Sequence, residues 1–316
     1  MAATRREARL LLGGPIATEI RSAVAEDVEA YRVRAGHPPG LAVVIVGRDA
    51  PSMVYLQQIL KSCDNVGIRG TLVELEVEGE ATESRVTEVI RVLNADPLVN
   101  GIIVQMPLPP TIRLRSVIDA IDPAKDIDGI HPLNAGLLRL GYDGFLPATA
   151  HAAVEMVRRS GIEITGRRAV VVGRSAVVGM PAAFLLVREN ATVTVCHSRT
   201  RDLAHHVKDA EILVVAAGQP GLVTGSMLRR GAVVVDVGIN VVDGKLVGDV
   251  DFESARQVAS AITPVPGGVG PLTNALLLVH LARAANTQLE AATAHAAQRS
   301  EGDRSARTHA GQPVKH

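Results

Sequence analysis

The chain has 316 residues, of which 47% are hydrophobic and only 2% aromatic, so it can bury a large aliphatic core and suits two domains of ordinary size. Its 33 basic and 33 acidic residues give a formal net charge of zero, which provides no electrostatic footprint for nucleic acid or an anionic membrane. No apolar run reaches the about 18 residues that a membrane helix needs. We therefore expect neither nucleic acid nor a membrane as a partner.

The N-terminus and the cysteines indicate a cytoplasmic protein. The N-terminus is basic, but the Gly-Gly-Pro of residues 13–15 is expected to break the segment that follows it, which argues against a signal peptide. Cys63 and Cys196 have neither CxxC spacing nor a cluster of other ligands around them. We predict that both are buried free thiols, as suits a reducing compartment.

The first half of the chain alternates helical and strand patterns. Apolar residues recur at helical spacing through residues 16–35, and the β-branched run of residues 40–47 is typical of a buried parallel strand. The helix that comes next carries Tyr55, and Asp49 or Ser52 can cap it. The other predicted elements here are strands over residues 71–77 and 101–105 and a helix over residues 83–94.

Gln105 stands at the carboxyl end of the last of these strands. Prolines at positions 107, 109 and 110 end regular structure directly after it. Ligands of open α/β sheets bind outside the carboxyl ends of the strands. Gln105 is therefore a candidate site residue, although a lone glutamine after a strand is more often structural.

The second half repeats the strand and helix pattern after a connecting helix over residues 149–159. Four apolar runs predict the parallel strands of a Rossmann-like cofactor domain: residues 168–173, 191–196, 211–216 and 231–236. A strongly apolar helix is predicted after them, over residues 273–286. The tail from residue 287 is poor in large apolar residues, so we expect disorder there, and its scattered histidines predict no metal site.

A glycine turn, residues 173–179 (GRSAVVG), joins the first of these strands to a helix. It is not the G-x-G-x-x-G fingerprint, but glycine lets the backbone approach a phosphate and a helix N-terminus offers N–H groups to it. The next strand ends without the acidic residue that binds the ribose of NAD. Arg174, Ser198 and Arg199 can instead receive a 2′-phosphate, which favours NADP over NAD. Taken alone, the arginines are equally well explained as surface charge.

Further segments occur in a fixed order along the chain. They are residues 49–63, 101–109 (GIIVQMPLP), 125–129 (KDIDG), 131–134 (HPLN), 172–175 (VGRS), 191–200 (ATVTVCHSRT), 236–240 (DVGIN), 248–251 (GDVD) and 262–271 (ITPVPGGVGP). This ordered set resembles the bifunctional methylenetetrahydrofolate dehydrogenase/cyclohydrolase family over residues from about 12 to 286. No single segment is decisive, but the set is highly specific.

The resemblance implies an α/β fold of two domains with a cleft between them. The N-terminal α/β folate domain would comprise residues 1–148 plus 273–288, and the Rossmann-like NADP domain residues 149–272. Residues 289–316 would form a disordered tail. The last helix would pack back on the first domain, and two copies would associate through the cofactor domain as a homodimer.

The resemblance also implies roles for individual residues, with a tetrahydrofolate derivative as substrate, NADP as cofactor and no metal. Tyr55 would border the folate, Gln105 would hydrogen-bond in the pocket and Asp128 would hold the pterin ring. The folate side of the cleft would be lined by Pro266, Gly267, Gly268, Val269 and Gly270. The cofactor would contact Gly173, Arg174, Ser175, Ser198 and Ile239. Each has a plainer explanation: an Asp in a turn is usually structural, and His131 can simply start a helix.

Ile59 is the main departure from the family pattern. In the family the catalytic tyrosine is followed four residues later by a catalytic lysine, and here that position holds isoleucine. Positions 55 and 59 share a helix face, whereas Lys61 is turned away from it by roughly 120°. Hydride transfer needs orientation of two bound molecules, but hydrolysis of the methenyl product needs a group that moves protons. We therefore expect the dehydrogenase activity to survive and the cyclohydrolase activity to be lost or strongly impaired.

Smaller departures keep other functions open. Residues 147–150 read Pro-Ala-Thr-Ala where the family has Pro-Cys-Thr-Pro, Leu272 replaces a methionine and Asn274 a typically apolar residue. These changes affect the interdomain helix and the fit of the substrate. The alternatives are a specialised relative that acts on another folate adduct, and a catalytically silent protein that binds folate or NADP. Binding of both ligands without turnover would favour the silent protein.

Overall fold

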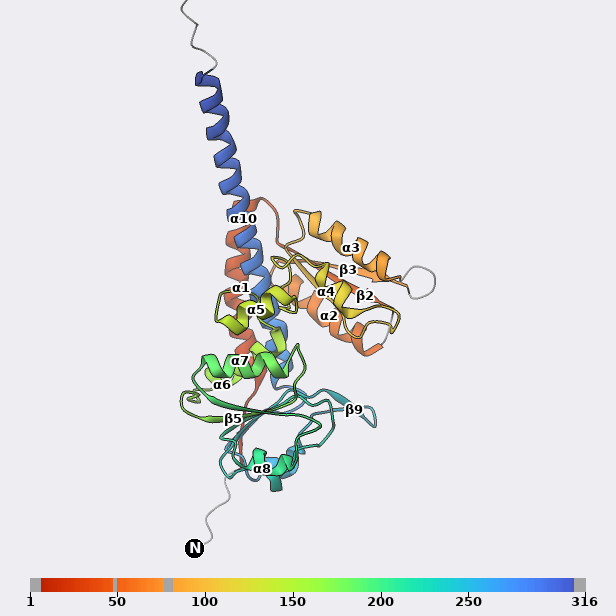
Figure 1. The fold of residues 1–316 in the computed structure, drawn as a ribbon, viewed down its shortest axis with the longest axis vertical. Helices are drawn as coiled ribbons and strands as arrows, with labels where there is room; N and C mark the ends of the chain where they lie inside the picture. The colour runs from red at the N-terminus through yellow and green to blue at the C-terminus, as the bar shows by residue number, and fades with distance from the viewer. Residues whose placement is uncertain (1–6, 48–49, 77–81, 310–316) are drawn as a thin grey trace, which may run out of the picture.

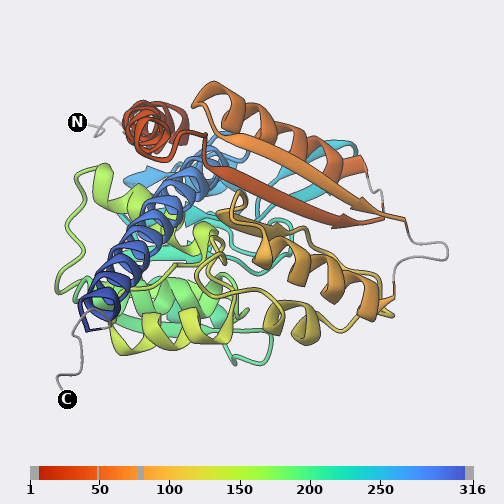
Figure 2. The same cartoon turned by 90° about the horizontal axis from the view of Figure 1, so that it is seen from above.

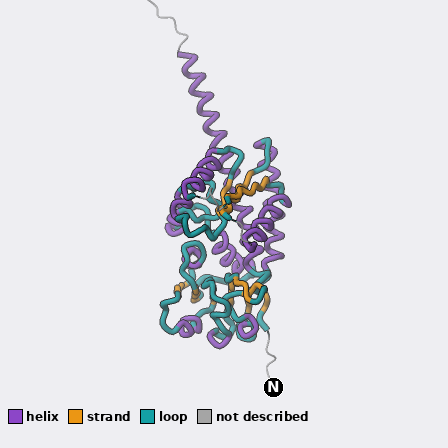
Figure 3. Tube along the Cα trace, turned by 90° about the vertical axis from the view of Figure 1, so that its right-hand side faces the viewer, coloured by secondary structure: helices purple, strands orange, loops and turns teal. Residues whose placement is uncertain are grey.

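The computed structural model describes residues 7–47, 50–76 and 82–309. The chain forms two α/β lobes, one above the other along the long axis, and helix α10 (Val269–His309) rises beyond the upper lobe (Figure 1). Each lobe holds its own group of strands with helices around it (Figure 3). The predicted two-domain α/β architecture is confirmed.

The first lobe contains a three-stranded parallel sheet in the order β3-β2-β4. Its strands are β2 (Gly40–Val46), β3 (Arg69–Leu75) and β4 (Gly101–Val104). Every residue of β2 and β4 is buried, as their continuous apolar sequences predicted. The helices of this lobe are α2 (Ala50–Asn65), α3 (Glu83–Ala95), α4 (Leu114–Asp119) and α5 (Pro132–Leu140).

The second lobe contains a six-stranded parallel sheet in the order β1-β11-β8-β7-β5-β6. The four predicted strands are β5 (Arg168–Val172), β6 (Thr192–Cys196), β7 (Ile212–Val215) and β8 (Val233–Asp236). Two strands that we did not predict, β1 (Arg9–Leu10) and β11 (Ala261–Ile262), extend it on one side. They were missed because a two-residue strand has no period to detect.

Shorter elements complete the second lobe. Strands β9 (Asn240–Val242) and β10 (Lys245–Val247) form a separate antiparallel pair. The helices here are α7 (Gly179–Arg188), α8 (Leu203–Lys208), η1 (Gly225–Met227) and α9 (Phe252–Ala255). Strand β1 belongs to the second sheet although it precedes α1 and the first lobe in sequence. The predicted domain boundaries stay predictions.

Three helices join the lobes: α1 (Gly13–Ala35), α6 (Ala148–Arg159) and α10. Helix α10 packs along both α1 and α6 and also touches α2 and β4, so the predicted packing of the last helix on the first lobe is confirmed. Figure 2 shows α10 crossing the molecule beside α1. The buried face of α1 carries the predicted apolar positions Ile20, Val24 and Val28.

Several predicted boundaries were wrong. Residues 13–15 begin α1 instead of interrupting the chain, because proline in a first helical turn sacrifices no hydrogen bond. Strand β3 starts at Arg69, and the predicted end at residue 77 lies outside the described residues, as does the proposed cap Asp49. Helix α10 continues to His309, since residues 287–309 are rich in Ala, Gln, Glu and Arg, which favour helix. The expected disorder is therefore not found over that range.

Two residue-level predictions are confirmed. His131 is the N-cap of α5, and its Nδ1 accepts the backbone N–H of Leu133 at 3.0 Å. Cys63 and Cys196 are free and buried, and burial raises the pKa of the Cys63 thiol to about 12. Among the described residues, no helix is both long and apolar enough to cross a membrane.

Lys125 supports the first lobe from inside. Its ammonium group donates to the carbonyl oxygens of Leu93 at 3.1 Å, Asn94 at 2.7 Å and Asp96 at 2.8 Å, where α3 ends. The side chain is only 6% exposed. A buried cation here satisfies carbonyls that the helix leaves unpaired and opposes the negative end of its dipole.

Replacing this lysine should destabilise the fold. We expect Lys125→Met to lower the free energy of unfolding by about 2–4 kcal/mol, since three carbonyl groups lose a charged donor. Urea unfolding measures the change. The exposed Lys245→Met is the matched control and should be neutral. Equal stabilities of the two variants would contradict the supporting role of Lys125.

Candidate active site

Gln105 lies directly after β4, at the carboxyl edge of the first sheet. Its backbone N–H donates to the carbonyl oxygen of Val44 in β2 at 2.8 Å, and its side-chain amide donates to the carbonyl oxygen of Met106 at 2.7 Å. Helix α2 begins at Ala50, soon after β2 ends at Val46, so it starts from the same edge. The sheet therefore brings Gln105 and the start of α2 together, as parallel strands require.

The segment that contains Asp128 runs beside β4. An isolated parallel bridge pairs Ile102 with Asp126, and the backbone N–H of Ile102 donates to the carbonyl oxygen of Lys125 at 2.8 Å. Asp128, two residues further along, thus lies toward the same carboxyl edge as Gln105. The structure brings these two predicted site residues to one end of one sheet.

Asp126 builds the turn that presents Asp128, a role that sequence reasoning missed. Its fully buried carboxylate accepts the backbone N–H groups of Ile130 at 3.2 Å and His131 at 2.8 Å, and the side-chain amide of Asn134 at 2.8 Å. The motif of residues 125–129 carried the signal, but nothing in it distinguishes the carboxylate that anchors the turn from the one that is predicted to face a ligand.

The carboxyl group of Asp128 has an unusual proton affinity. Burial, and after it the negative charge of Asp126, raises its pKa to about 7, and a hydrogen bond from the backbone of Ala148 opposes both effects. Ala148 is the first residue of α6, so Asp128 lies against the start of the connecting helix. A carboxyl group that titrates near neutral pH can accept hydrogen bonds when ionised and donate one when protonated.

Ile59 lies in the core, with no exposed surface, on the face of α2 that also buries Leu56 and Cys63. Lys61 is exposed, so the prediction that it points away from this face is confirmed. Tyr55 belongs to α2, but its side chain lies outside the described residues. Among the described residues of α2, the only ionisable side chain on this buried face is the Cys63 thiol, whose pKa burial raises to about 12.

The predicted folate loop is anchored on the first lobe. The backbone N–H of Gly13, the first residue of α1, donates to the carbonyl oxygen of Gly267 at 2.9 Å, and a β-carbon at Gly13 would overlap the carbonyl oxygen of Gly268. Pro266, Gly267 and Gly270 are more exposed than Gly268 and Val269, which are buried. Val269 and Gly270 are already the first two residues of α10, so the position of this segment is fixed by both α1 and α10.

Asn274 lies further along α10 and is only 7% exposed. Its Oδ1 is buried and has no hydrogen-bond partner among the described residues. A buried carbonyl oxygen without a donor costs free energy, so a polar group of a ligand is one way to satisfy it. Leu272, which replaces the family's methionine, is fully buried.

The predicted cofactor residues gather at the carboxyl edge of the second sheet. Val172 in β5 pairs with Cys196 in β6, and the N–H of Gly173 donates to the carbonyl oxygen of Cys196 at 2.9 Å. Arg174 and Ser198 each come two residues after these paired positions and are exposed. The structure therefore brings two of the three side chains predicted to receive a 2′-phosphate to adjacent places on one edge, and the third, Arg199, follows Ser198 and is also exposed.

Gly173 and Ser175 shape the turn itself. Gly173 has φ +128°, and a β-carbon there would overlap the carbonyl oxygen of Ala216, so only glycine fits. The Ser175 hydroxyl accepts the N–H groups of Val178 and Gly179, both at 3.2 Å, and so caps the start of α7. Contact of Ser175 with a cofactor stays a prediction.

Asp236 and Asp249 hold the neighbouring loops, and sequence reasoning gave neither of them a role. Asp249 accepts the N–H groups of Ala217 at 2.6 Å, Gly218 at 2.8 Å and Gln219 at 2.8 Å, all beyond the end of β7. Asp236 accepts those of Gly238, Asp249 and Val250, each at 3.0 Å. These bonds place the loop whose tip is Ile239, which is 68% exposed. Burial raises the pKa of Asp236 to about 6.

The opposite edge of the second sheet has a polar hollow of about 410 Å³. It is lined by charged side chains that include Arg167, Glu211 and Arg229, and none of the predicted site residues borders it. Glu211 lies within 3.3 Å of Arg167 and 3.5 Å of Arg229, so its charge is already balanced there. The predicted site residues lie at the carboxyl edges instead.

The unusual pKa of Asp128 leads to a prediction about stability. A carboxyl group whose pKa rises on folding contributes stability that is complete below its ordinary pKa and is lost as the pH rises toward 7. Asp128→Asn should therefore be more stable than the original chain at pH 8 by about 1–3 kcal/mol, a figure reduced for partial exposure. The difference should vanish toward pH 4.

Thermal unfolding at both pH values tests this. Asp27→Asn, an exposed change on α1, is the control and should show no pH-dependent difference. A less stable Asp128→Asn at pH 8 would mean that its surroundings favour the ionised form.

Comparison with known proteins identifies the family to which both lobes belong. Residues 11–128 match the tetrahydrofolate dehydrogenase/cyclohydrolase catalytic domain, and residues 147–289 match the NAD(P)-binding domain of the same family. The bifunctional protein FolD of Acetivibrio thermocellus is 49% identical over 283 residues, which cover 89% of this chain and 98% of that protein. The FolD protein of Moorella thermoacetica is 48% identical over 88% of this chain and 99% of its own length.

Solved structures give the same result. The bifunctional FolD enzyme of Campylobacter jejuni has a TM-score of 0.86 and 38% identity over 89% of this chain and 99% of its own. The Trypanosoma brucei methylenetetrahydrofolate dehydrogenase-cyclohydrolase, a complex with NADP and an inhibitor, has a TM-score of 0.84 and 39% identity over 91% and 99%. With both domains matched and relatives nearly half identical along their whole length, the chain belongs to the tetrahydrofolate dehydrogenase/cyclohydrolase family.

Proposed function

We propose that the chain catalyses the NADP-dependent oxidation of 5,10-methylenetetrahydrofolate to 5,10-methenyltetrahydrofolate and hydrolyses the product poorly or not at all. The observation that carries this proposal is the fully buried Ile59, which occupies the position where the family has its catalytic lysine. Family membership supports the substrate and the cofactor, and the Trypanosoma brucei relative was solved with NADP.

The dehydrogenase half requires two bound molecules in the right orientation. NADP supplies the hydride acceptor when it is bound. Gly173 and the N-terminus of α7 can approach its phosphates, and Arg174 with Ser198 can hold the 2′-phosphate. On the first lobe, Asp128 can pair with the amino and N–H edge of the pterin ring, and Gln105 can hydrogen-bond beside it. None of these tasks needs a side chain at position 59 that moves protons.

The hydrolytic half lacks such a group. Attack of water on the methenyl product needs a base to take a proton, and a well-placed one is worth about 10²–10⁴ in rate. Isoleucine cannot titrate, and Lys61, Gln57 and Gln58 are all exposed, away from the buried face of α2. The methenyl product should therefore accumulate.

One observation favours a second candidate, a relative specialised for another folate adduct. The unpartnered buried Oδ1 of Asn274 stands close in sequence to the loop of residues 264–270 and suits a substrate with an additional donor. Homodimerisation through the second lobe also stays a proposal; the edge strand β6 of its sheet is available for such pairing.

Restoring an amine at position 59 tests the main proposal. Methenyltetrahydrofolate absorbance is followed with purified protein, methylenetetrahydrofolate and NADP, and then with the methenyl compound alone. The original chain should accumulate the product and leave its decay at the rate in buffer. Ile59→Lys should accelerate that decay by about 10²-fold or more and should also lower the melting temperature, since a buried ammonium is costly.

The matched control is Gln58→Lys, which adds the same charge to the adjacent exposed position. It should change neither decay nor stability. Fast decay with the original chain would contradict the proposed loss of hydrolysis, and a folded Ile59→Lys without any gain would show that the missing lysine is not the cause. No oxidation despite tight binding of both ligands would favour a binding role.

Cofactor preference gives an independent prediction. Arg174→Ala should weaken NADP binding by about 10- to 100-fold, the worth of a charged hydrogen bond to phosphate, and change NAD binding by less than about twofold. Calorimetric titration of each cofactor measures both. Arg188→Ala, an exposed change at the far end of α7, should leave both unchanged. An equal loss for NADP and NAD would place Arg174 away from the 2′-phosphate.

A further inference from the structure

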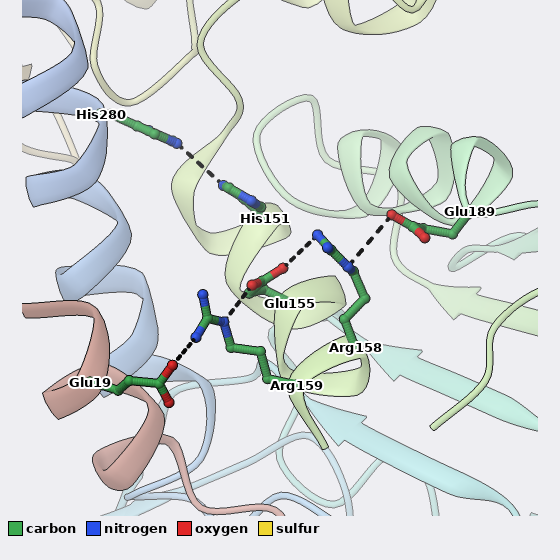
Figure 4. Close-up of polar contacts among 7 residues, drawn as sticks. All are labelled: Glu19, His151, Glu155, Arg158, Arg159, Glu189 and His280. Atoms are coloured by element: carbon green, nitrogen blue, oxygen red, sulfur yellow. Dashed lines mark hydrogen bonds and ion pairs between the residues drawn. The ribbon is translucent and has the colours of Figure 1, made fainter. Parts of the chain in front are cut away.

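Two histidines meet in the interior where α6 and α10 cross (Figure 4). His151 Nδ1 lies 3.2 Å from His280 Nε2, and the two ring planes are 7° apart. His280 is 4% exposed, and its Nδ1 lies 2.8 Å from the carbonyl oxygen of Ile127. Ile127 is the residue before Asp128, so this pair contacts the segment that carries the candidate pterin ligand.

The carbonyl group fixes the protonation of both rings. A carbonyl oxygen only accepts, so His280 Nδ1 must carry a hydrogen and donate it to Ile127. In a neutral ring Nε2 is then an acceptor, and His151 Nδ1 must donate to it. The result is a directed chain of two hydrogen bonds from α6 through α10 to residue 127.

The surroundings keep both rings neutral. Burial lowers the pKa of His280 to about 3, with His151 and Arg283 adding to the effect, and burial likewise lowers the pKa of His151. The carboxylate on the same helix, Glu155, is already bound by Arg158 at 3.0 Å and Arg159 at 2.6 Å (Figure 4). The carboxylate near Ile127, that of Asp126, is likewise already bound, by the backbone N–H groups of its own turn.

The arginines that hold Glu155 are themselves tied to other elements. Arg159 reaches Glu19 of α1 at 2.9 Å, and Arg158 lies 3.9 Å from Glu189 at the end of α7. These ion pairs connect α6 to α1 and to the end of α7. His151 lies in the first turn of the same helix and is the donor to His280.

Residues 127 and 128 are thus both held from the first turn of α6. Asp128 receives a hydrogen bond from the backbone of Ala148, and Ile127 receives one from His280, which His151 orients. Losing the second connection would leave the Ile127 carbonyl oxygen without this donor, so the peptide that leads into Asp128, and the carboxyl group after it, would lose one of its constraints.

We propose that His280, oriented by His151, is a positioning residue that sets the place of the Asp128 carboxyl group and thereby the binding of the folate ring. The role of Asp128 toward folate rests on the proposed function; the hydrogen-bond chain itself does not. His280 touches no reacting atom, and its effect passes through the peptide of Ile127.

The test compares His280→Leu with His280→Asn. Leucine cannot donate to Ile127, so the dissociation constant of tetrahydrofolate should rise about tenfold while that of NADP stays within about twofold. Asparagine keeps an N–H near the position of Nδ1 and should retain affinity within about threefold. His295→Leu, an exposed change on the same helix, is the control and should change nothing.

The pH profile separates positioning from general loss of structure. Folate binding by the original chain should rise with pH around 7, as Asp128 ionises. In His280→Leu the carboxyl group moves toward water, so the midpoint should fall, whereas His280→Asn should keep it. An unchanged midpoint and affinity in folded His280→Leu would overturn the proposal. If His280→Leu does not fold, His151→Leu serves as the second variant. It removes the donor that orients His280, so the affinity for tetrahydrofolate and the pH midpoint should change in the same directions.

A ligand-free measurement keeps the two proposals distinguishable. Nitrogen-15 NMR of the labelled chain at pH 7 should show His280 as the neutral Nδ1–H form, and a charged ring or the Nε2–H form would overturn the inference whatever the substrate. If the rings are as inferred but the original chain binds no tetrahydrofolate, the proposed function fails and the hydrogen-bond chain stands.

Discussion

Helix α10 begins at the predicted folate loop and packs along α1 and α6, and the burial of its apolar face determines how the two lobes meet. Leu272, Leu277, Leu278 and Leu281 are each at most 3% exposed, and burying such a side chain is worth about 1.5–3 kcal/mol. Gly101 lets Leu281 and Ile127 approach β4 closely, since a β-carbon there would meet both side chains. The same helix therefore holds the loop of residues 264–270 at its start and the segment before Asp128 further along.

Buried polar groups place the loops that this apolar packing leaves undetermined. Asp126, Asp249 and Lys125 each lie in the interior, and each is bound to three or more partners, so the cost of removing them from water is offset. Their partners are mostly backbone groups at the ends of strands and helices. The candidate ligand residues Asp128 and Ile239 lie next to such anchors and have fewer bonds of their own. In both lobes, buried and fully hydrogen-bonded residues thus position the neighbouring residues that are candidates for ligand contact.

The sequence predicted the strands well because their burial is a local property, written as continuous apolar runs. It also placed Gln105, Arg174 and Ser198 just after strand ends. In the structure, Gln105 follows β4 at the carboxyl edge of the first sheet, and Arg174 and Ser198 follow the paired strands β5 and β6 of the second. It did not predict β1 or β11, because a strand of two residues has no period, and it did not predict the His151–His280 pair, because that contact joins residues that are far apart in the chain. The length of α10 was missed for a different reason: helix propensity without an apolar face was interpreted as disorder. Elements with a long apolar pattern could therefore be inferred from the sequence, whereas very short strands, helices without an apolar face and side-chain pairs distant in the chain could not.

Position 59 illustrates how one residue serves either packing or chemistry. An isoleucine with no exposed surface adds to the core beneath α2, whereas an ammonium group at the same point would need a charged or polar partner to offset its desolvation. The half-buried Gln105 lies at the end of the adjacent sheet, and its amide already donates to Met106. Under the proposed function, exchanging lysine for isoleucine removes the hydrolytic step and relieves the core of a buried charge, while hydride transfer depends on the two strand edges that the exchange leaves intact. Loss of one activity and gain of stability are then consequences of the same substitution.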